Sequence, residues 1–351
     1  MKRALAFGVL LALAPPATAQ PTTLRIATYY PDLTRKGPGL LLRDILAGKD
    51  PQIAAVIKTI AALNADVLVL TDIDFDHGRV ALTALADRLA DAGSPYPHHF
   101  TSRPNTGMAT GLDMNGDGRL GGPGDAQGFG FFAGKSGLAV LSRLPIIEPQ
   151  FRDFSDFLWA DLPNNTLGDS MANPARAAQR LSTTAHWDLP VTLPNGTPLH
   201  LLIYRATPPV FDGVEDRNGR RNHDETAFWT QLLNGTLPYA PPPAPFIILG
   251  DANLDPVDGD GNRTAINTLL GDPRIQDPAQ TGIPGRPDTR GDATRDTALY
   301  DFGGLRVDYV LPSADLTITN AGVDWPLSGD LAAAHAAASR HRPVWVDIAL
   351  P

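Results

Sequence analysis

Hydrophobic runs and helical spacing alternate along this chain. Short apolar runs of the kind found in buried strands lie at 24–29, 66–70, 137–141, 181–187, 199–204, 246–250, 305–311 and 343–349. Between them, apolar residues recur at helical spacing over 51–63, 78–91, 224–233 and 264–270. Strands and helices therefore interleave throughout, which is typical of α/β proteins.

The strand predicted at 246–250 ends in a chemically informative sequence. Gly250-Asp251-Ala252-Asn253 places a carboxylate and an amide side by side at the end of four apolar residues. Aspartate can bind a hard cation or polarise water, and asparagine can donate to an anionic oxygen. Far downstream, Asp308 and His341 suggest an imidazole held by a carboxylate. Together these residues favour metal-assisted hydrolysis of a phosphate ester, although a Gly-Asp-x-Asn sequence after a strand is often only a turn.

The amino terminus predicts export. Met1-Lys2-Arg3 is followed by an apolar run from Ala4 to Ala14, which is too short to span a bilayer. Ala17-Thr18-Ala19 fits the small-x-small pattern of a cleavage site. We therefore expect a signal peptide over 1–19, in preference to a buried N-terminal helix, and a secreted or periplasmic protein. No later run is apolar and long enough to cross a membrane.

Composition narrows the picture further. The remaining chain, 20–351, is long enough for a large core and contains no clear linker, so we expect one domain. A net charge of −9 argues against a broad nucleic-acid surface, which needs a basic face, but allows a small phosphorylated substrate. The chain has no cysteine, so an oxidising compartment supplies no disulfide.

From Leu24-Arg25-Ile26-Ala27-Thr28 to Val344-Trp345-Val346-Asp347, the chain resembles the endonuclease/exonuclease/phosphatase superfamily of metal-dependent phosphoesterases. It is most similar to a group of secreted bacterial members with segments like 110–130, 208–213 and 215–222. The resemblance implies a four-layer α/β/β/α sandwich, in which two facing mixed β-sheets are flanked by helices. It also places the active site at one end of the sandwich.

The resemblance assigns roles to four residues. It implies that Asp251 aligns or activates the water and that Asn253 contacts the phosphate. His341 matches the terminal histidine, which acts as a general base or stabilises a phosphate oxygen, and Asp308 matches the aspartate that orients it.

Four positions depart from the family pattern. Tyr30 stands where the first strand usually ends in Asn, and Asp72 stands where the second usually ends in a metal-binding Glu. Arg205 replaces a His before Thr207-Pro208-Pro209, and Arg340 replaces the Asp of a Ser-Asp-His sequence.

The departures predict a more cationic site. Asp72 keeps the charge of the Glu but reaches less far, and we expect it to hold the catalytic Mg²⁺ or Mn²⁺. Asp74 and Asp76 would share its face if the strand continues. Tyr30, Arg205 and Arg340 are expected to bind substrate, which favours phosphate binding over metal binding. The alternative is that the two arginines pair with surface carboxylates.

A second group of residues resembles half of a calcium loop. Asp113, Asn115 and Asp117 have the D-x-N-x-D-G spacing in which oxygens recur every second residue and Gly allows a sharp turn. Gly124 stands where the loop needs a bidentate Glu, and Asp125 is a possible substitute. We expect a structural Ca²⁺ here, or else a turn without an ion.

The leading hypothesis is a secreted, divalent-metal-dependent phosphoester hydrolase of phosphodiesterase, nuclease or phosphatase type. Its substrate would be a phosphate-ester small molecule or a short nucleic acid, since the fold does not choose between them. One alternative is a non-catalytic or weakly active member, a pseudoenzyme that binds an anionic phosphate ligand. Another is a calcium-stabilised protein with a vestigial cleft. The sequence indicates no protein partner.

Overall fold

The computed structural model describes residues 23–168, 171–282 and 290–350. The predicted signal peptide, 1–19, lies outside the described residues. Within them, no helix has the length and apolar character needed to cross a membrane.

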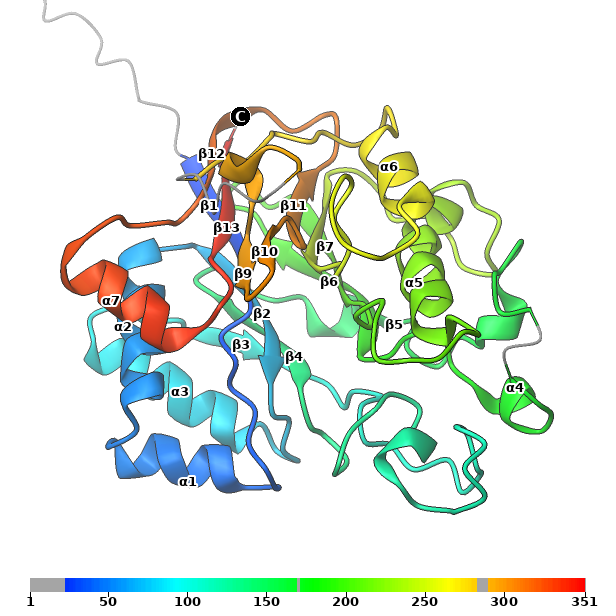
Figure 1. Cartoon of the computed structure of the whole chain (residues 1–351). Coiled ribbons are helices and arrows are strands. Elements are labelled where there is room, and N and C mark those ends of the chain that lie inside the picture. The colour runs from blue at the N-terminus through cyan, green and yellow to red at the C-terminus, as the bar shows by residue number, and fades with distance from the viewer. Residues whose placement is uncertain (1–22, 169–170, 283–289, 351) are drawn as a thin grey trace, which may run out of the picture.

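Most strands belong to two large mixed sheets (Figure 1). The first has the order β12-β13-β1-β2-β4-β3, with bounds Ile318–Val323, Val344–Ala349, Thr23–Tyr29, Val67–Ile73, Gly137–Ser142 and His98–Phe100. The second has the order β11-β8-β7-β6-β5, with bounds Asp308–Pro312, Phe246–Asp251, Pro198–Arg205, Ala185–Thr192 and Arg152–Asp153. Strands β9 (Ala298–Tyr300) and β10 (Gly303–Leu305) form a separate hairpin. The parallel pairs are β1 with β2 and β7 with β8.

Helices cover the outer face of each sheet (Figure 1). The first sheet packs against α1 (Leu40–Ala47), α2 (Pro51–Leu63), α3 (Val80–Asp91) and α7 (Gly329–Ala338). The second packs against α5 (Arg217–Leu233) and α6 (Thr264–Leu270). The described residues also form the short helix α4 (Ala175–Ala178) and single 3₁₀ turns at Pro123–Asp125, Glu148–Gln150, Trp159–Asp161 and Ala293–Arg295.

Alternation along the strands builds three apolar layers. In β2, Val67 and Val69 belong to the core between the two sheets, whereas Leu68 and Leu70 pack against helices. Successive side chains of a strand point to opposite faces, so a strand buried on both faces is apolar throughout. The predicted four-layer α/β/β/α sandwich is confirmed.

The sequence located most elements, and the differences have local causes. Helices α2 and α6 have the predicted bounds, and Asp50 caps α2 by accepting from the backbone of Gln52 and Ile53. Helix α5 begins earlier than predicted, at Arg217. Helices α1 and α7 were not predicted, and neither has a side-chain cap to mark its start.

The strand predicted at 181–187 begins later, at Ala185, and continues to Thr192. The Leu181 amide bonds to the Phe157 carbonyl instead of joining the ladder. Asp188 interrupts the apolar pattern that predicts a strand, yet it is buried because Arg152 and His200 both bond to it.

Candidate active site

Strand ends from both sheets bring the predicted site residues together. Arg205 is the last residue of β7, Asp251 is the last of β8 and Asp308 is the first of β11. Asp251 is the register partner of both Arg205 and Asp308, so strand pairing alone places these three side by side. Asp72, near the end of β2, faces them from the other sheet and forms an ion pair with Arg205.

The turn after β8 holds Asp251 and Asn253 in one fixed arrangement. A Cβ on Gly250, whose φ is 140°, would lie 2.0 Å from the Tyr204 carbonyl oxygen, so only glycine fits there. Asp251 accepts from the Asn253 backbone at 2.8 Å and from its Nδ2 at 2.9 Å. The Asn253 amide also donates to the Ala206 carbonyl at 2.8 Å. Asn253 therefore orients Asp251 directly.

The predicted Asp–His pair is formed. His341 Nδ1 lies 2.8 Å from Asp308 Oδ2, and both residues are buried. The Thr297 hydroxyl donates to the same Asp308 oxygen at 2.9 Å and accepts from the Asp308 backbone at 3.0 Å. Burial by itself lowers the pKa of His341, but the charge and hydrogen bond of Asp308 outweigh it and raise the pKa above its usual value.

Arg205 sits between carboxylates from the two sheets. Its Nη1 lies 3.2 Å from Asp72 Oδ1, and its Nε lies 3.5 Å from Asp251 Oδ2. Nη1 also donates to Ser136 Oγ at 2.5 Å, and that hydroxyl bonds to Asp72 Oδ1. Burial opposes the charge on Arg205, but Tyr30, Asp72 and Asp251 raise its pKa above the usual value.

Tyr30 contacts both His341 and Arg205. It follows β1 directly, and its ring stacks on the His341 imidazole, with centroids 4.1 Å apart. Its hydroxyl accepts from Arg205 Nη2 at 3.0 Å. Tyr30 therefore offers a flat apolar face and a hydroxyl to the site.

The pKa of Asp251 suits this carboxyl of the site to exchange a proton at neutral pH. Burial, reinforced by the charge of Asp308, raises the pKa of Asp251 to about 7, although His341 and Arg205 act in the opposite direction. A group with a pKa near the working pH is an efficient general base.

The side chains around Asp72 do not fit a divalent metal ion. Asp72 Oδ1 already bonds to Ser136 and pairs with Arg205, and both Asp251 oxygens accept from Asn253. Among the described carboxylate oxygens of these strand ends, Asp72 Oδ2 and Asp308 Oδ1 are buried without a hydrogen-bond partner. In the part of the chain that the structure describes, no group of three or more His, Cys, Asp or Glu residues is arranged to hold a metal ion.

Asp74 and Asp76 do not join the site, because β2 ends at Ile73. Asp74 accepts from Thr34 Oγ1 and from the backbone of Arg35 and Ser136. Asp76 accepts from the first two amides of α3.

Arg340 lies at the rim of the site. It is exposed, and its guanidinium carbon is 5.5 Å from the centre of the Tyr300 ring, which in turn stacks on Phe302. The predicted phosphate-binding arginines are therefore separated: Arg205 lies inside the site, and Arg340 lies at its opening.

Two pockets meet at the site. One, of about 680 Å³, extends past His341 toward Tyr300 and Phe302, and the other, of about 490 Å³, extends past Asp72 toward Phe129. They share five lining residues, Tyr30, Asp32, Arg205, Pro208 and Phe211. A molecule bound at Arg205 therefore has space on two sides.

Sequence reasoning missed Asp32, Ser136 and Thr297. Asp32 lines both pockets, and partial burial together with the charge of Asp72 raises its pKa. Ser136 and Thr297 bond to Asp72 and Asp308 from distant parts of the chain, so no local pattern identifies them. The one available signal was the position of Asp32 just beyond the first strand.

The predicted calcium loop forms at some distance along the chain from these residues. Asp113 Oδ1 accepts from the Gly116 and Asp117 amides at 2.7 and 3.1 Å, and its Oδ2 accepts from Gly118 at 2.9 Å. Asp125 accepts from the Met114 and Gly122 amides, each at 3.0 Å. The loop is compact, and calcium binding there stays a prediction.

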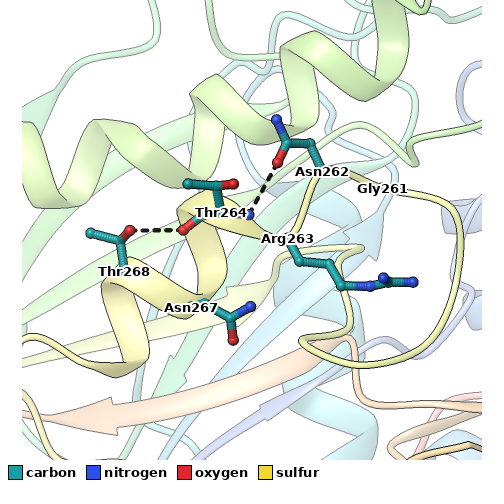
Figure 2. Close-up of a pocket in the computed structure, with 6 residues that line it drawn as sticks. All are labelled: Gly261, Asn262, Arg263, Thr264, Asn267 and Thr268. Atoms are coloured by element: carbon teal, nitrogen blue, oxygen red, sulfur yellow. Dashed lines mark hydrogen bonds between the residues drawn. The ribbon is translucent and has the colours of Figure 1, made fainter.

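A further hollow lies outside the site, near the start of α6 (Figure 2). Its side chains bond within their own turn: Asn262 accepts from the Thr264 amide, and the Thr268 hydroxyl donates to the Thr264 carbonyl. None of the predicted site residues lines it.

Known families and structures match the chain over most of its length. The profile of the Endonuclease/Exonuclease/phosphatase family matches residues 43–341. An endonuclease/exonuclease/phosphatase from Beutenbergia cavernae is 16% identical with a TM-score of 0.55, covering 93% of this chain and 72% of that one. A family protein from Bacteroides thetaiotaomicron is 12% identical with a TM-score of 0.52, covering 95% and 100%. At such low identities these structures show the shared fold alone. No curated protein matches the sequence.

Proposed function

The chain belongs to the endonuclease/exonuclease/phosphatase family, and from this premise we propose that it is a secreted hydrolase of phosphate esters. The proposal rests on the meeting of Asp251 with the Asp308–His341 pair beside Arg205, which lines both pockets. Family membership supports a phosphoesterase or nuclease type of hydrolase. Secretion rests on the sequence of residues 1–19.

In the proposed reaction, Asp251 accepts a proton from water while the water oxygen bonds to phosphorus. The bond from phosphorus to the leaving oxygen breaks with its electron pair. A pKa of about 7 suits Asp251 to the proton transfer. Protonated His341, held by Asp308, and the fixed charge of Arg205 stabilise the phosphoryl oxygens.

Asp72 and Asp251 bear on the metal requirement of the site. Members of this family generally depend on a divalent metal ion, and the sequence assigned Mg²⁺ or Mn²⁺ to Asp72. The contacts of Asp72 and Asp251 do not favour that assignment, so no step of the proposed reaction passes through a metal ion.

The two pockets favour a phosphodiester over a monoester. A diester carries a group on each side of phosphorus, and both pockets border Arg205. The net charge of −9 disfavours a long polyanion, so a small diester or a short nucleic acid is the expected substrate.

A second candidate function is binding without turnover. It is favoured by the two ion pairs of Arg205, which engage both Asp72 and the proposed base Asp251. A site locked in this way would hold a phosphate ligand and leave water unactivated.

Hydrolysis of bis-(p-nitrophenyl) phosphate and p-nitrophenyl phosphate tests both candidates. The wild-type protein, Asp251→Ala and the control Asp330→Asn should be compared with Mg²⁺, Mn²⁺, Ca²⁺ or a chelator. Asp330 is a fully exposed acid on α7, outside the cleft. Turnover that is lost only in Asp251→Ala supports hydrolysis. Saturable phosphate binding without turnover in any of the three supports the binding function instead.

A further inference from the structure

We infer that the guanidinium of Arg205 is the resident cation of this site, held where Asp72 and Asp251 would otherwise share a divalent metal ion. The inference rests on the proposed function only for the location of the site. It concerns what balances the buried charge there, and its test measures metal binding instead of turnover.

Two buried carboxylates from different sheets face one guanidinium. Asp72 and Asp251 are 1% and 0% exposed, and Arg205 approaches them at 3.2 and 3.5 Å. A buried carboxylate is costly unless a counter-charge and hydrogen bonds compensate for its lost hydration. Within the described ranges, Arg205 forms the ion pair of each.

The hydrogen bonds of the two acids leave little room for metal ligation. A Mg²⁺ ion needs six oxygens at about 2.0–2.1 Å in near-octahedral geometry. Asp72 Oδ1 is bonded to Ser136, and the Asp251 oxygens accept from the backbone and side chain of Asn253. A metal ion would have to displace Arg205 and break several of these bonds at once.

Arg205 is anchored for this role by its position and its contacts. The register of β7 against β8 places it directly beside Asp251. Its Nη2 donates to the Tyr30 hydroxyl, its Nη1 donates to Ser136, and its guanidinium carbon lies 4.9 Å from the centre of the Tyr30 ring. Arginine suits such a site because its planar fork is permanently charged and bonds in several directions.

A covalently attached cation has a functional consequence. Its charge does not depend on metal supply and cannot be removed by a chelator. Guanidinium groups also bind phosphate oxygens in a bidentate manner, so a phosphate ester would compete with Asp72 and Asp251 for the same group.

The test is a Mn²⁺ titration followed by electron paramagnetic resonance, with thermal melting in parallel. The wild-type protein is expected to show no Mn²⁺ site that depends on Asp72. Arg205→Met, which keeps the bulk and removes the charge, should gain one site with at least roughly tenfold higher affinity, because two unpaired buried acids then favour a divalent partner. Adding Asp72→Asn to Arg205→Met should abolish the gain.

Arg205→Lys is the matched control, since it keeps the charge and should gain no site. Arg205→Gln is a second neutral variant in case Arg205→Met does not fold. The inference is overturned if wild type binds one Mn²⁺ that Asp72→Asn removes, or if a folded neutral variant gains no site. Mn²⁺ at the Asp113 loop is distinguished because Asp72→Asn leaves it in place. A protein without phosphoesterase turnover still gives a clear answer here.

Discussion

Tyr30 lies flat against the imidazole of His341, with the two ring planes inclined by only 9°. Through its hydroxyl, the same side chain bonds to Arg205. Tyr30 therefore positions both groups that would face a phosphoryl oxygen. Two substitutions of Tyr30 separate the effect of its hydroxyl from the effect of its ring.

Tyr30→Phe should lower kcat/KM by about ten- to a hundredfold, because a hydrogen bond to a charged group contributes about 1.5–3 kcal/mol. Tyr30→Ala should lower it much further, since the stack on His341 is also lost. Steady-state hydrolysis of bis-(p-nitrophenyl) phosphate measures both. Tyr239→Phe, in the apolar cluster with Phe154 and Phe157, is the control and should have no effect. Equal losses in Tyr30→Phe and Tyr30→Ala would mean that the stack contributes nothing.

The pH profile of kcat/KM should be bell-shaped. Asp251, with a pKa of about 7, must lose its proton to act as a base, so activity rises as the pH increases through that value. His341 has a raised pKa and must stay protonated to hold a phosphoryl oxygen, so activity falls on the alkaline side. Because Asp251 and His341 interact, the two apparent pKa values read from the profile belong to the pair and not to either residue alone. A rate that is independent of pH between 5 and 8 would contradict these roles.

Stability should change with pH in a related way. The folded-state pKa of Asp251 lies above its unfolded value, so the folded protein binds the proton more tightly. The stabilisation of the folded state by this proton is fully present below the unfolded pKa of about 4 and is lost as the pH rises through about 7. Asp251→Asn imitates the protonated acid and should lose less stability over this range than wild type. Urea unfolding at several pH values checks the difference.

Glu225→Gln should destabilise the protein by about 1–3 kcal/mol, the cost of a buried group left without its partner. Glu225 is buried in α5 and accepts from the Thr183 and Thr207 amides at 2.5 and 2.7 Å. A glutamine offers one acceptor oxygen, so its amide group would face one of these donors. Thermal or urea denaturation measures the loss. Gln231→Glu, at a partly exposed position of the same helix, should change stability little.

Calcium should raise the melting temperature by a few degrees if the Asp113 loop binds it, because a ligand that binds only the folded state stabilises that state. Asp113→Asn should lose the response, and Asp260→Asn, in another acidic loop, should keep it. An identical melting temperature in calcium and in chelator would show that the loop holds its shape through the amides of Gly116, Asp117 and Gly118 alone.

Sequence reasoning was most successful where strand order fixes geometry. Asp251 follows an apolar run, and the family resemblance implied a role for Asp308; the register of β8 and β11 brings the two together. The bonding of Arg205 to Asp72 could not be predicted in the same way. It depends on how the two sheets pack and on Ser136, whose bond to Asp72 spans 64 residues of sequence. The resemblance implies that Arg205 departs from the family pattern, and only the packing of the two sheets shows what it contacts.

The two pockets that join at Arg205 also bear on the order in which products depart. When a diester is cleaved, each fragment would lie in a different pocket. Departure of one fragment would then not require departure of the other, so release would follow no fixed sequence. Inhibitors that resemble the two fragments should bind at the same time instead of excluding each other.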